Sequence, residues 1–439
     1  MKPTLQTRRK FLRTSALGAA ATWTLPVFLE KTFLALDAMA AGALTQTASG
    51  KDDTILVVLQ LAGGNDGLNT VVPFADDGYH RARPTLALAP DKILKLDSYI
   101  GLNGKLSGLK SLHDDGHLAL VQGVGYPNPN RSHFRSTEIW QTASDAQQVV
   151  SEGWLGRYFD SCCKGADPTV GVAISDAAPQ AFTAKAPTGV TLSRPEQFRW
   201  RASTGSDGKP LSAEELFYRQ LIGEAEETAP SDGNPIAALP GKTRTSSSTE
   251  DFLRRTALDA QISSDKILAI SRKYQTNTPY PPTQLGASLS LIARMIGGGL
   301  ATRVYYASLG GFDTHAGQIN SHERLMGVLD DAIRAFVADL KQQGNFERVL
   351  LMTFSEFGRR VAENANSGTD HGAAAPMFLI GGRAKAGVFG KHPSLSELDN
   401  GDLKFSVDFR SVYASVLEKW LRAPSELVLG KKFETLPIV

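Results

Sequence analysis

Continuous apolar runs alternate along most of the chain with segments in which apolar residues recur at helical spacing. Residues 54–61 read Thr-Ile-Leu-Val-Val-Leu-Gln-Leu, a β-rich run typical of a strand buried on both faces. Similar runs at 118–122, 302–309, 348–354 and 377–380 predict further strands.

Helical spacing predicts helices over residues 106–114, 285–296 and 409–421, and a longer helix that starts at Asn320 or Ser321 and continues to 340. Strands that alternate with helices favour a mainly parallel sheet covered on both faces. We therefore expect α/β architecture, a three-layer α/β/α sandwich with insertions.

The boundaries of this domain follow from changes in composition. Residues 41–53 have the character of a flexible lead-in, and Ser, Thr, Gly, Asp and Pro dominate residues 194–250. The second stretch is expected to be a polar insertion or a mobile surface segment. We expect residues 54–439 to form a single domain that carries this insertion.

The first 40 residues resemble a twin-arginine export signal. Residues 7–13 read Thr-Arg-Arg-Lys-Phe-Leu-Arg, and Ala38-Met39-Ala40 offers a small-residue cleavage site. The apolar stretch at 16–29 is shorter than the roughly 20 residues that span a bilayer, so we expect no stable membrane span after cleavage. The resemblance implies the twin-arginine translocation machinery as a partner and a periplasmic or secreted protein.

Charge argues against one class of function, and the cysteine content limits the possible disulfides. The 439 residues carry 47 basic and 45 acidic side chains, and six of the basic ones lie in the first 40 residues. The near-neutral remainder has no basic run, which argues against nucleic-acid binding. The two cysteines, Cys162 and Cys163, are adjacent and fit two plain thiols, with a strained vicinal disulfide as the alternative.

Metal-type and nucleophilic side chains follow several of the apolar runs. In open α/β sheets ligands bind outside the carboxyl ends of the strands, so these side chains are expected to meet at one edge. The chemistry-bearing positions are Asp66, Arg131, Ser132, Asp313, His315, Glu356, Asp370 and His371.

Carboxylates and imidazoles without a thiolate suit a divalent ion such as Zn, Mn, Mg or Ca. A pair of such ions can hold both oxygens of an in-line displacement at phosphorus or sulfur. Ser132 lies where a helix should begin, so it is either an N-cap or a nucleophile, and Arg131 could bind an anion's oxygens. The candidate metal ligands are Asp66, Asp313, His315, Glu356, Asp370 and His371.

Several of these positions also have a purely structural interpretation. Asp66 lies in a Gly-Asn-Asp-Gly sequence typical of tight turns, and residues 313–315 fit an Asx-turn with a hydrogen-bonded histidine. Glu356 could pair with a neighbouring arginine. The adjacent titratable residues Asp370 and His371 ahead of a buried strand favour the metal site.

The motifs together resemble a bacterial family catalogued as domain of unknown function 1501, which is grouped with the alkaline phosphatase and sulfatase superfamily. The resemblance covers residues 54–435 and implies an alkaline-phosphatase-like fold and hydrolysis of phosphate or sulfate esters. It is carried by Leu-Ala-Gly-Gly-Asn-Asp66-Gly, Asn-Arg-Ser132-His-Phe, Gly-Gly-Phe-Asp313-Thr-His315, Ser-Glu356-Phe-Gly-Arg and Thr-Asp370-His371-Gly.

The resemblance also implies roles. Asp66 resembles the first-strand aspartate that binds metal, and Ser132 resembles the nucleophile. Asp313 and His315 resemble an Asp/His ligand set, and His371 a late histidine ligand. The resemblance departs at 356–357, where Glu-Phe replaces an Asp-His pair. Either Glu356 and Asp370 compensate, only one metal binds, or the site is silent.

These observations lead to one expected function and its rivals. The expected function is an exported, metal-dependent hydrolase of phosphate or sulfate esters that acts on a small-molecule or glycan ester. The first rival is a catalytically silent envelope protein of the same fold that binds a glycan or protein partner. The second is an oxidoreductase, which the export route suggests but for which the sequence has no cofactor motif.

Overall fold

The computed structural model describes residues 54–164, 166–185, 189–193, 263 and 266–439. The expected signal at 1–40, the lead-in at 41–53 and the polar insertion at 194–250 lie outside these residues.

A nine-stranded sheet forms the centre of the described part, in the order β11-β5-β10-β9-β1-β8-β6-β7, with β12 paired to β5. Every pair is parallel except the two made by β10, which is antiparallel to both β5 and β9. The mainly parallel sheet expected from the sequence is therefore confirmed. The strands are β1 Ile55–Leu61, β5 Leu118–Gly125, β6 Gly171–Ile174, β7 Val190–Leu192, β8 Val304–Leu309, β9 Val349–Phe354, β10 Ala375–Ile380, β11 Gly387–Phe389 and β12 Val407–Asp408.

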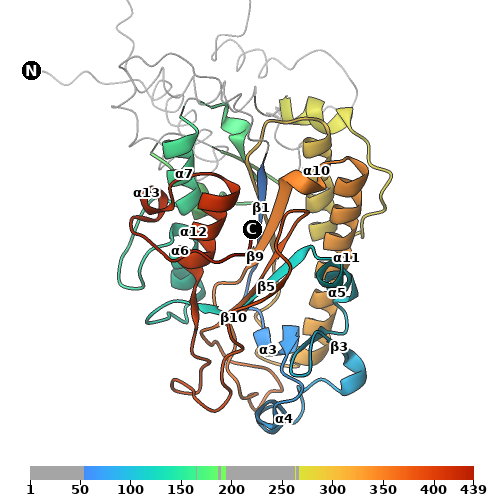
Figure 1. Ribbon diagram of the computed structural model, residues 1–439, viewed down its shortest axis with the longest axis vertical. Helices are drawn as coiled ribbons and strands as arrows, with labels where there is room; N and C mark the ends of the chain where they lie inside the picture. Colours follow the sequence, from blue (N-terminus) through green and yellow to red (C-terminus); the bar gives the residue numbers. More distant parts are fainter. Residues whose placement is uncertain (1–53, 165, 186–188, 194–262, 264–265) are drawn as a thin grey trace, which may run out of the picture.

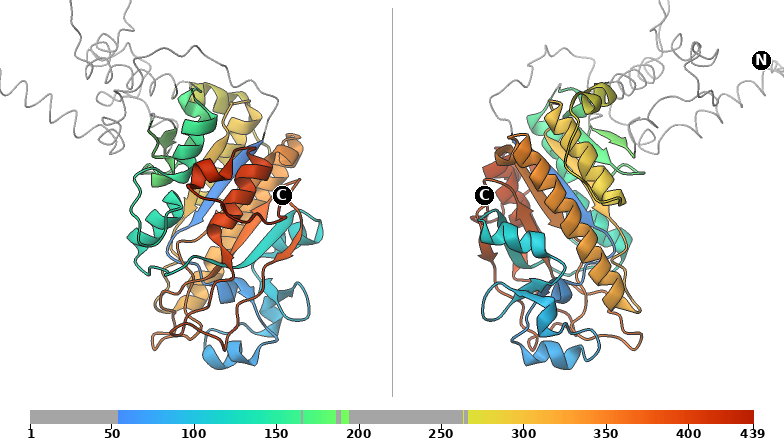
Figure 2. Two further views of the ribbon diagram at one scale, coloured as in Figure 1. Left: turned by 60° about the vertical axis from the view of Figure 1, so that its left-hand side comes forward. Right: turned by 90° about the vertical axis from the view of Figure 1, so that its right-hand side faces the viewer.

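Helices cover both faces of this sheet (Figure 1; Figure 2). Alternate residues of β1 show the three layers: Val57 and Leu59 pack into one core, and Leu56 and Val58 into the other. The first core is covered by α5 Ser107–Asp114, α10 Gln284–Gly297 and α11 Gln318–Gln342. The second is covered by α6 His133–Thr142, α7 Trp154–Cys162, α12 Phe409–Ser415 with a π-helical turn at Val416–Trp420, and α13 Ser425–Leu429.

The strand register decides where the connecting loops meet. In β1, Leu61 pairs with Leu309 of β8, and Gln60 pairs with Phe354 of β9, so the three strands end at one level. Because β10 runs the opposite way, its first residue, Ala375, lies toward the same edge, beside Val124 of β5. The segments after β1, β8, β9 and β5 and the segment before β10 therefore share one edge of the sheet.

A smaller three-stranded sheet follows β1 at this edge, and the sequence analysis did not anticipate it (Figure 1). It contains β2 Val71–Val72, β4 Gly101–Asn103 and β3 Ile93–Lys95, with α3 Gly67–Thr70 and α4 Asp77–Ala82 beside it. Short 3-10 turns occur at Pro90–Lys92, Pro168–Val170, Gln180–Phe182 and Phe346–Arg348.

The predicted start of the long helix is wrong by a few residues. Helix α11 begins at Gln318, with Gly317 at its N-cap, rather than at Asn320 or Ser321. Gln318 is buried, and its side-chain amide oxygen accepts hydrogen bonds from Thr314 and Thr369, so tertiary contacts extend the helix toward its N-terminus.

Two further features bear on earlier expectations. Cys162 and Cys163, at the end of α7, are free thiols. Among the helices of the described residues, none combines the length and apolar character needed to cross a bilayer.

Candidate metal centre

Three histidines and one aspartate converge at the edge where the strands end. Asp313 and His315 follow β8, His371 precedes β10, and His133 is the first residue of α6. Oδ1 of Asp313 is 3.1 Å from Nε2 of both His371 and His315, and its Oδ2 is 3.5 Å from Nε2 of His133. Nε2 of His315 is 2.9 Å from Nε2 of His371. Ligand atoms of His133, Asp313 and His371 all lie within 4.8 Å of one another.

The other ring nitrogen of each histidine, Nδ1, faces an oxygen that can only accept a hydrogen bond. We therefore assign the proton of each neutral ring to Nδ1, which leaves a lone pair on Nε2. The Nδ1 partners are the main-chain oxygen of Arg131 at 2.7 Å from His371, Oε1 of Glu356 at 3.0 Å from His133, and Oδ1 of Asp370 at 3.3 Å from His315.

This tautomer assignment makes the centre of the cluster deficient in positive charge. Three Nε2 lone pairs and the carboxylate of Asp313 face one another at 2.9 to 3.5 Å, and a cation held between them would offset the repulsion of these like acceptors. Imidazole and carboxylate ligands suit borderline or hard divalent ions. The residues present therefore fit a metal ion.

Arg359 fixes the charge and orientation of Asp313. Nη2 of Arg359 donates to Oδ1 of Asp313 at 2.8 Å. Partial burial opposes ionisation, but the hydrogen bond and the positive charge of Arg359 outweigh it and lower the pKa of Asp313 to about 2. Asp313 is therefore a carboxylate at neutral pH, as a metal ligand must be.

The buried Arg359 guanidinium also ties three loops together. It donates to the main-chain oxygens of Gly64 at 2.7 Å, Thr369 at 2.8 Å and Phe312 at 3.0 Å, and also to that of Gly63. These residues belong to the segments after β1, before β10 and after β8. One side chain thus holds the segments that carry the cluster.

Gly63 allows two of these loops to touch. It has φ +116°, and a Cβ placed on it would lie 2.5 Å from the main-chain nitrogen of Asp313. Its own N–H donates to Oε1 of Glu356 at 2.7 Å. Gly63 thus permits the close approach of the β1 and β8 loops.

Phe357 occupies the position at which the family resemblance departs from the phosphatases. Its buried ring lies 4.4 Å from the ring of His371 and 4.9 Å from that of His133, centre to centre. The phenyl group therefore packs against two of the imidazoles and adds no ligand.

Glu356 and Asp370 lie beside the cluster, on the Nδ1 sides of His133 and His315. Because Nδ1 and Nε2 point in divergent directions, these carboxylates do not face the same space as the Nε2 atoms. Asp370 also accepts from Nδ2 of Asn364 at 3.1 Å, which lowers the pKa of Asp370. Within the described residues, the buried Oε2 of Glu356 has no hydrogen-bond partner.

Asp66 lies in a separate buried network. Its Oδ2 is 2.6 Å from Nη1 of Arg83, its Oδ1 accepts from the main-chain nitrogen of Leu68 at the start of α3, and Gln318 donates to the same carboxylate. Burial alone would raise the pKa of Asp66, but the charge and hydrogen bonds of Arg83 outweigh it and lower the pKa. The structure therefore does not bring Asp66 together with the other predicted ligands.

Ser132 and Arg131 lie next to the cluster, directly before His133. Ser132 is exposed at the N-cap position of α6, but its hydroxyl makes no capping hydrogen bond. Its main-chain nitrogen donates to Oδ1 of Asn130 at 2.8 Å. Nε of Arg131 donates to Oδ2 of Asp402 at 2.9 Å.

The sequence analysis missed two residues of the centre, His133 and Arg359. Both lie inside motifs that it singled out, Asn-Arg-Ser-His-Phe and Ser-Glu-Phe-Gly-Arg. His133 comes after the same strand as Arg131 and Ser132. An imidazole at that position was enough to mark it as a candidate metal ligand. The role of Arg359 depends on main-chain oxygens far away in sequence, which the motif does not reveal.

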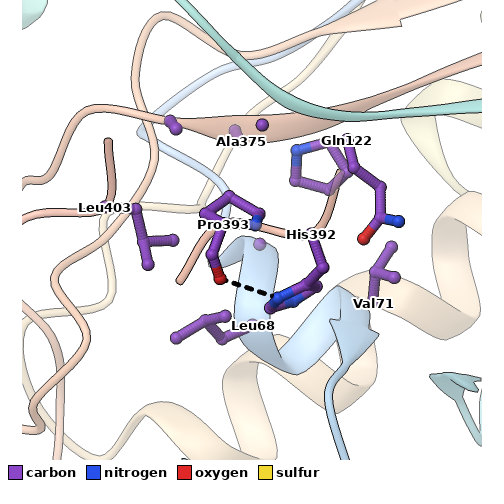
Figure 3. A pocket seen from close by; sticks show the side chains of 11 residues that line it. Leu68, Val71, Gln122, Ala375, His392, Pro393 and Leu403 are labelled. Atoms are coloured by element: carbon purple, nitrogen blue, oxygen red, sulfur yellow. Dashed lines mark hydrogen bonds between the residues drawn. The ribbon is translucent and has the colours of Figure 1, made fainter. Parts of the chain in front are cut away.

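A small pocket lies apart from this cluster, between α3, the start of β10 and residues 392–403 (Figure 3). Its lining is mostly apolar, and Nδ1 of His392 donates to the main-chain oxygen of Pro393 at 2.9 Å. Its lining residues are Gly67, Leu68, Val71, Gln122, Gly123, Ala374, Ala375, Pro376, His392, Pro393 and Leu403.

The protein family described as "Protein of unknown function (DUF1501)" matches residues 119–428. No curated protein matches the sequence.

Several solved structures align with this chain at about 10% sequence identity. A sulfatase from Pseudoalteromonas sp. is 10% identical over 94% of this chain and 75% of that chain, with a TM-score of 0.35. A phosphonate monoester hydrolase of Agrobacterium radiobacter is 10% identical over 87% and 78%, also with a TM-score of 0.35. A protein in the alkaline phosphatase superfamily from Vibrio parahaemolyticus is 9% identical over 84% and 72%, with a TM-score of 0.31.

Proposed function

The chain belongs to the DUF1501 family, and on this premise we propose that it is an exported, metal-dependent hydrolase of phosphate or sulfate esters. The observation that carries the proposal is the convergence of three imidazole Nε2 atoms on the carboxylate of Asp313. The resemblance of the family motifs to the alkaline phosphatase and sulfatase superfamily supports the class of reaction.

The ligands we assign are His133, Asp313, His315 and His371. A divalent ion held there would place positive charge beside an oxygen of the phosphate or sulfate group and stabilise the charge that develops in the transition state. Glu356, which the sequence suggested as a ligand, instead orients His133 in this proposal. Histidine ligands usually donate their second N–H to a carboxylate or carbonyl, which fixes the ring.

Asp370 and Asp66, the other two carboxylates predicted as ligands, take different roles in the proposal. Asp370 orients His315 through the same kind of contact that Glu356 makes with His133. Asp66 stabilises the loop after β1 through its ion pair with Arg83.

Ser132 is the proposed nucleophile. It lies at the N-terminus of α6, where free main-chain N–H groups and the positive end of the helix dipole favour an anion. The Ser132 oxygen would form a bond to phosphorus or sulfur as the bond to the leaving alcohol breaks, and the proton that the serine loses matches the one the alcohol gains. Water would then hydrolyse the serine ester. Arg131, next in sequence, is the proposed partner of the anion's oxygens.

Export through the twin-arginine pathway is part of the proposal, with the mature protein in the periplasm or secreted. It is supported by the Arg-Arg-Lys-Phe-Leu motif at residues 8–12 and the cleavage site near residue 40. Replacement of Arg8 and Arg9 by lysine should keep the protein in the cytoplasm, as cell fractionation would show. An unchanged distribution would contradict this route.

The central experiment measures the metal content and turnover of the mature protein purified without chelator. We expect one or two equivalents of Zn, Mn, Mg or Ca by mass spectrometry, and hydrolysis of an aryl phosphate or aryl sulfate. Asp313→Ala and His133→Ala should lose both, whereas His80→Ala, at an exposed histidine of α4, should lose neither.

Two results would contradict the proposal. Absence of metal in folded protein offered these ions would remove the metal centre. Stoichiometric metal without turnover of either ester class would instead favour the silent envelope protein that binds a glycan or protein partner.

A further inference from the structure

Two arginines from different loops approach one buried carboxylate near the metal centre. Nε of Arg131 is 2.9 Å from Oδ2 of Asp402, and its Nη2 donates to the same oxygen. Nε of Arg360 is 3.7 Å from Oδ1 of Asp402. The side chain of Asp402 is 2% exposed, whereas those of Arg131 and Arg360 are 42% and 38% exposed.

The main chain of both arginines contacts residues of the metal centre. The carbonyl oxygen of Arg131 accepts from Nδ1 of His371 at 2.7 Å, and the main-chain nitrogen of Arg360 donates to the carbonyl oxygen of Asp370 at 3.0 Å. Arg360 also follows Arg359, whose side chain holds Asp313. The main chains of the two arginines therefore adjoin the centre, and their guanidinium groups meet at Asp402.

The charges of this group do not balance. Two guanidinium cations share one carboxylate, and within the described residues neither arginine is paired with a second acid. Oδ1 of Asp402 is buried and makes no hydrogen bond to any described residue, and the 3.7 Å contact with Arg360 is too long for one. A surplus positive charge with exposed N–H donors remains, and planar guanidinium groups bind oxyanions through such donors.

We propose that Arg360, held beside Arg131 by the carboxylate of Asp402, binds a second oxyanion of the substrate, next to the ester whose oxygens Arg131 contacts. This inference rests on the proposed function and narrows its substrate class. The substrate would be a phosphate or sulfate ester that carries a further phosphate, sulfate or carboxylate group close to the scissile ester, as a multiply sulfated or phosphorylated sugar does.

The test compares two esters that differ by one charge, an aryl sulfate or phosphate and the same compound with an added sulfonate on the ring. For the wild type we expect the lower KM with the doubly charged ester. Arg360→Gln should raise that KM by about tenfold, which corresponds to about 1.4 kcal/mol, with little change in kcat. Arg360→Glu should raise it further, because its charge repels the oxyanion.

The matched control is Arg334→Gln, at an exposed arginine of α11 that also pairs with one aspartate, Asp331. This variant also removes one positive charge, but at a position away from the edge of the sheet. It should therefore leave the KM values of both esters unchanged. An equal effect of Arg360→Gln on the two esters, or no effect on either, would overturn the subsite.

A binding measurement separates this inference from the proposed hydrolysis. Calorimetric titration with benzene-1,3-disulfonate and with benzenesulfonate reports the subsite without turnover. Tighter binding of the disulfonate that is lost in Arg360→Gln supports the subsite even if no ester is hydrolysed. Hydrolysis without any preference for the second charge removes the subsite and leaves the hydrolase proposal intact.

Discussion

Glu356 and the proposed metal position lie on opposite sides of the His133 ring. Oε1 of Glu356 is 3.0 Å from Nδ1, while Nε2 of the same ring faces Asp313 at 3.5 Å. A carboxylate in this position can orient a histidine ligand but cannot share a metal ion with Nε2 of that histidine. The geometry thus separates two roles that the sequence motif alone does not distinguish.

Replacement of Glu356 by alanine should weaken metal binding without abolishing it. We expect a loss of about 10- to 100-fold in affinity, because His133 loses the partner that fixes its ring. Competition with a chromophoric chelator measures this affinity. Glu138→Ala, on the same helix α6 in a pair with Arg135, should have no such effect. Loss of stoichiometric metal, as expected for Asp313→Ala, would show instead that Glu356 is itself a ligand.

Replacement of Asp66 by asparagine should reduce stability and leave the metal content unchanged. The change leaves the fully buried Arg83 without its counter-charge, which costs about 3–5 kcal/mol in comparable buried pairs. Urea unfolding measures the free energy of unfolding. Asp77→Asn, at an exposed pair with Arg81 on α4, should change it by less than about 1 kcal/mol. Metal loss in folded Asp66→Asn would support the ligand role suggested by the family resemblance.

Replacement of Ser132 by alanine should abolish ester turnover while the metal content stays at the wild-type level. Loss of an attacking hydroxyl removes the covalent step, and a fall of at least about 10³-fold in kcat is expected. Ser111→Ala, on the surface of α5, is the control. Retention of turnover in Ser132→Ala would show that Ser132 is not the nucleophile and only occupies the N-cap position of α6.

The buried His322 should make stability depend on pH between about 6.5 and 4. Burial lowers the pKa of His322 to about 4, so the unfolded chain binds a proton in this range and the folded chain does not. The stabilisation is therefore complete above pH 6.5 and is lost as the pH falls toward 4, with a slope of up to about 1.4 kcal/mol per pH unit.

The variant His322→Gln isolates this contribution to the pH dependence. A glutamine can still donate to Oδ1 of Asn65, the partner of Nε2 of His322 at 3.1 Å. In urea unfolding of chelator-treated protein, the difference in stability between wild type and variant should shrink as the pH falls from 6.5 to 4. A difference that is constant over this range would contradict a neutral buried histidine.

The strands were predictable because their apolar runs are continuous, as a sheet covered on both faces requires. The runs at 54–61 and 348–354 correspond closely to β1 Ile55–Leu61 and β9 Val349–Phe354. The direction of β10 was not predictable, because periodicity gives no orientation. Its antiparallel pairing brings residues 370–371, which precede the strand, to the edge reached by residues that follow the other strands.

The members of the candidate site could be predicted only where the position of a residue directly after a strand determines which side chains lie near it. Asp313 and His315 lie at the edge that the strand-end rule suggests, whereas His371 reaches it from ahead of the antiparallel β10. Asp66 follows β1 by the same rule, yet it meets Arg83, a buried partner from the end of α4 that no local pattern indicates. The position of Glu356 was expected, but its role depends on which ring nitrogen of His133 it faces.

Arg359 gives the site a cooperative character. Its guanidinium is solvated in the unfolded chain and becomes fully paired only when the segments after β1, after β8 and before β10 are all in place. If one of these segments detaches, a buried cation loses acceptors, so partial opening is costly. The amide hydrogens of the three segments should therefore exchange with solvent at a common rate, as one cooperative unit that opens together.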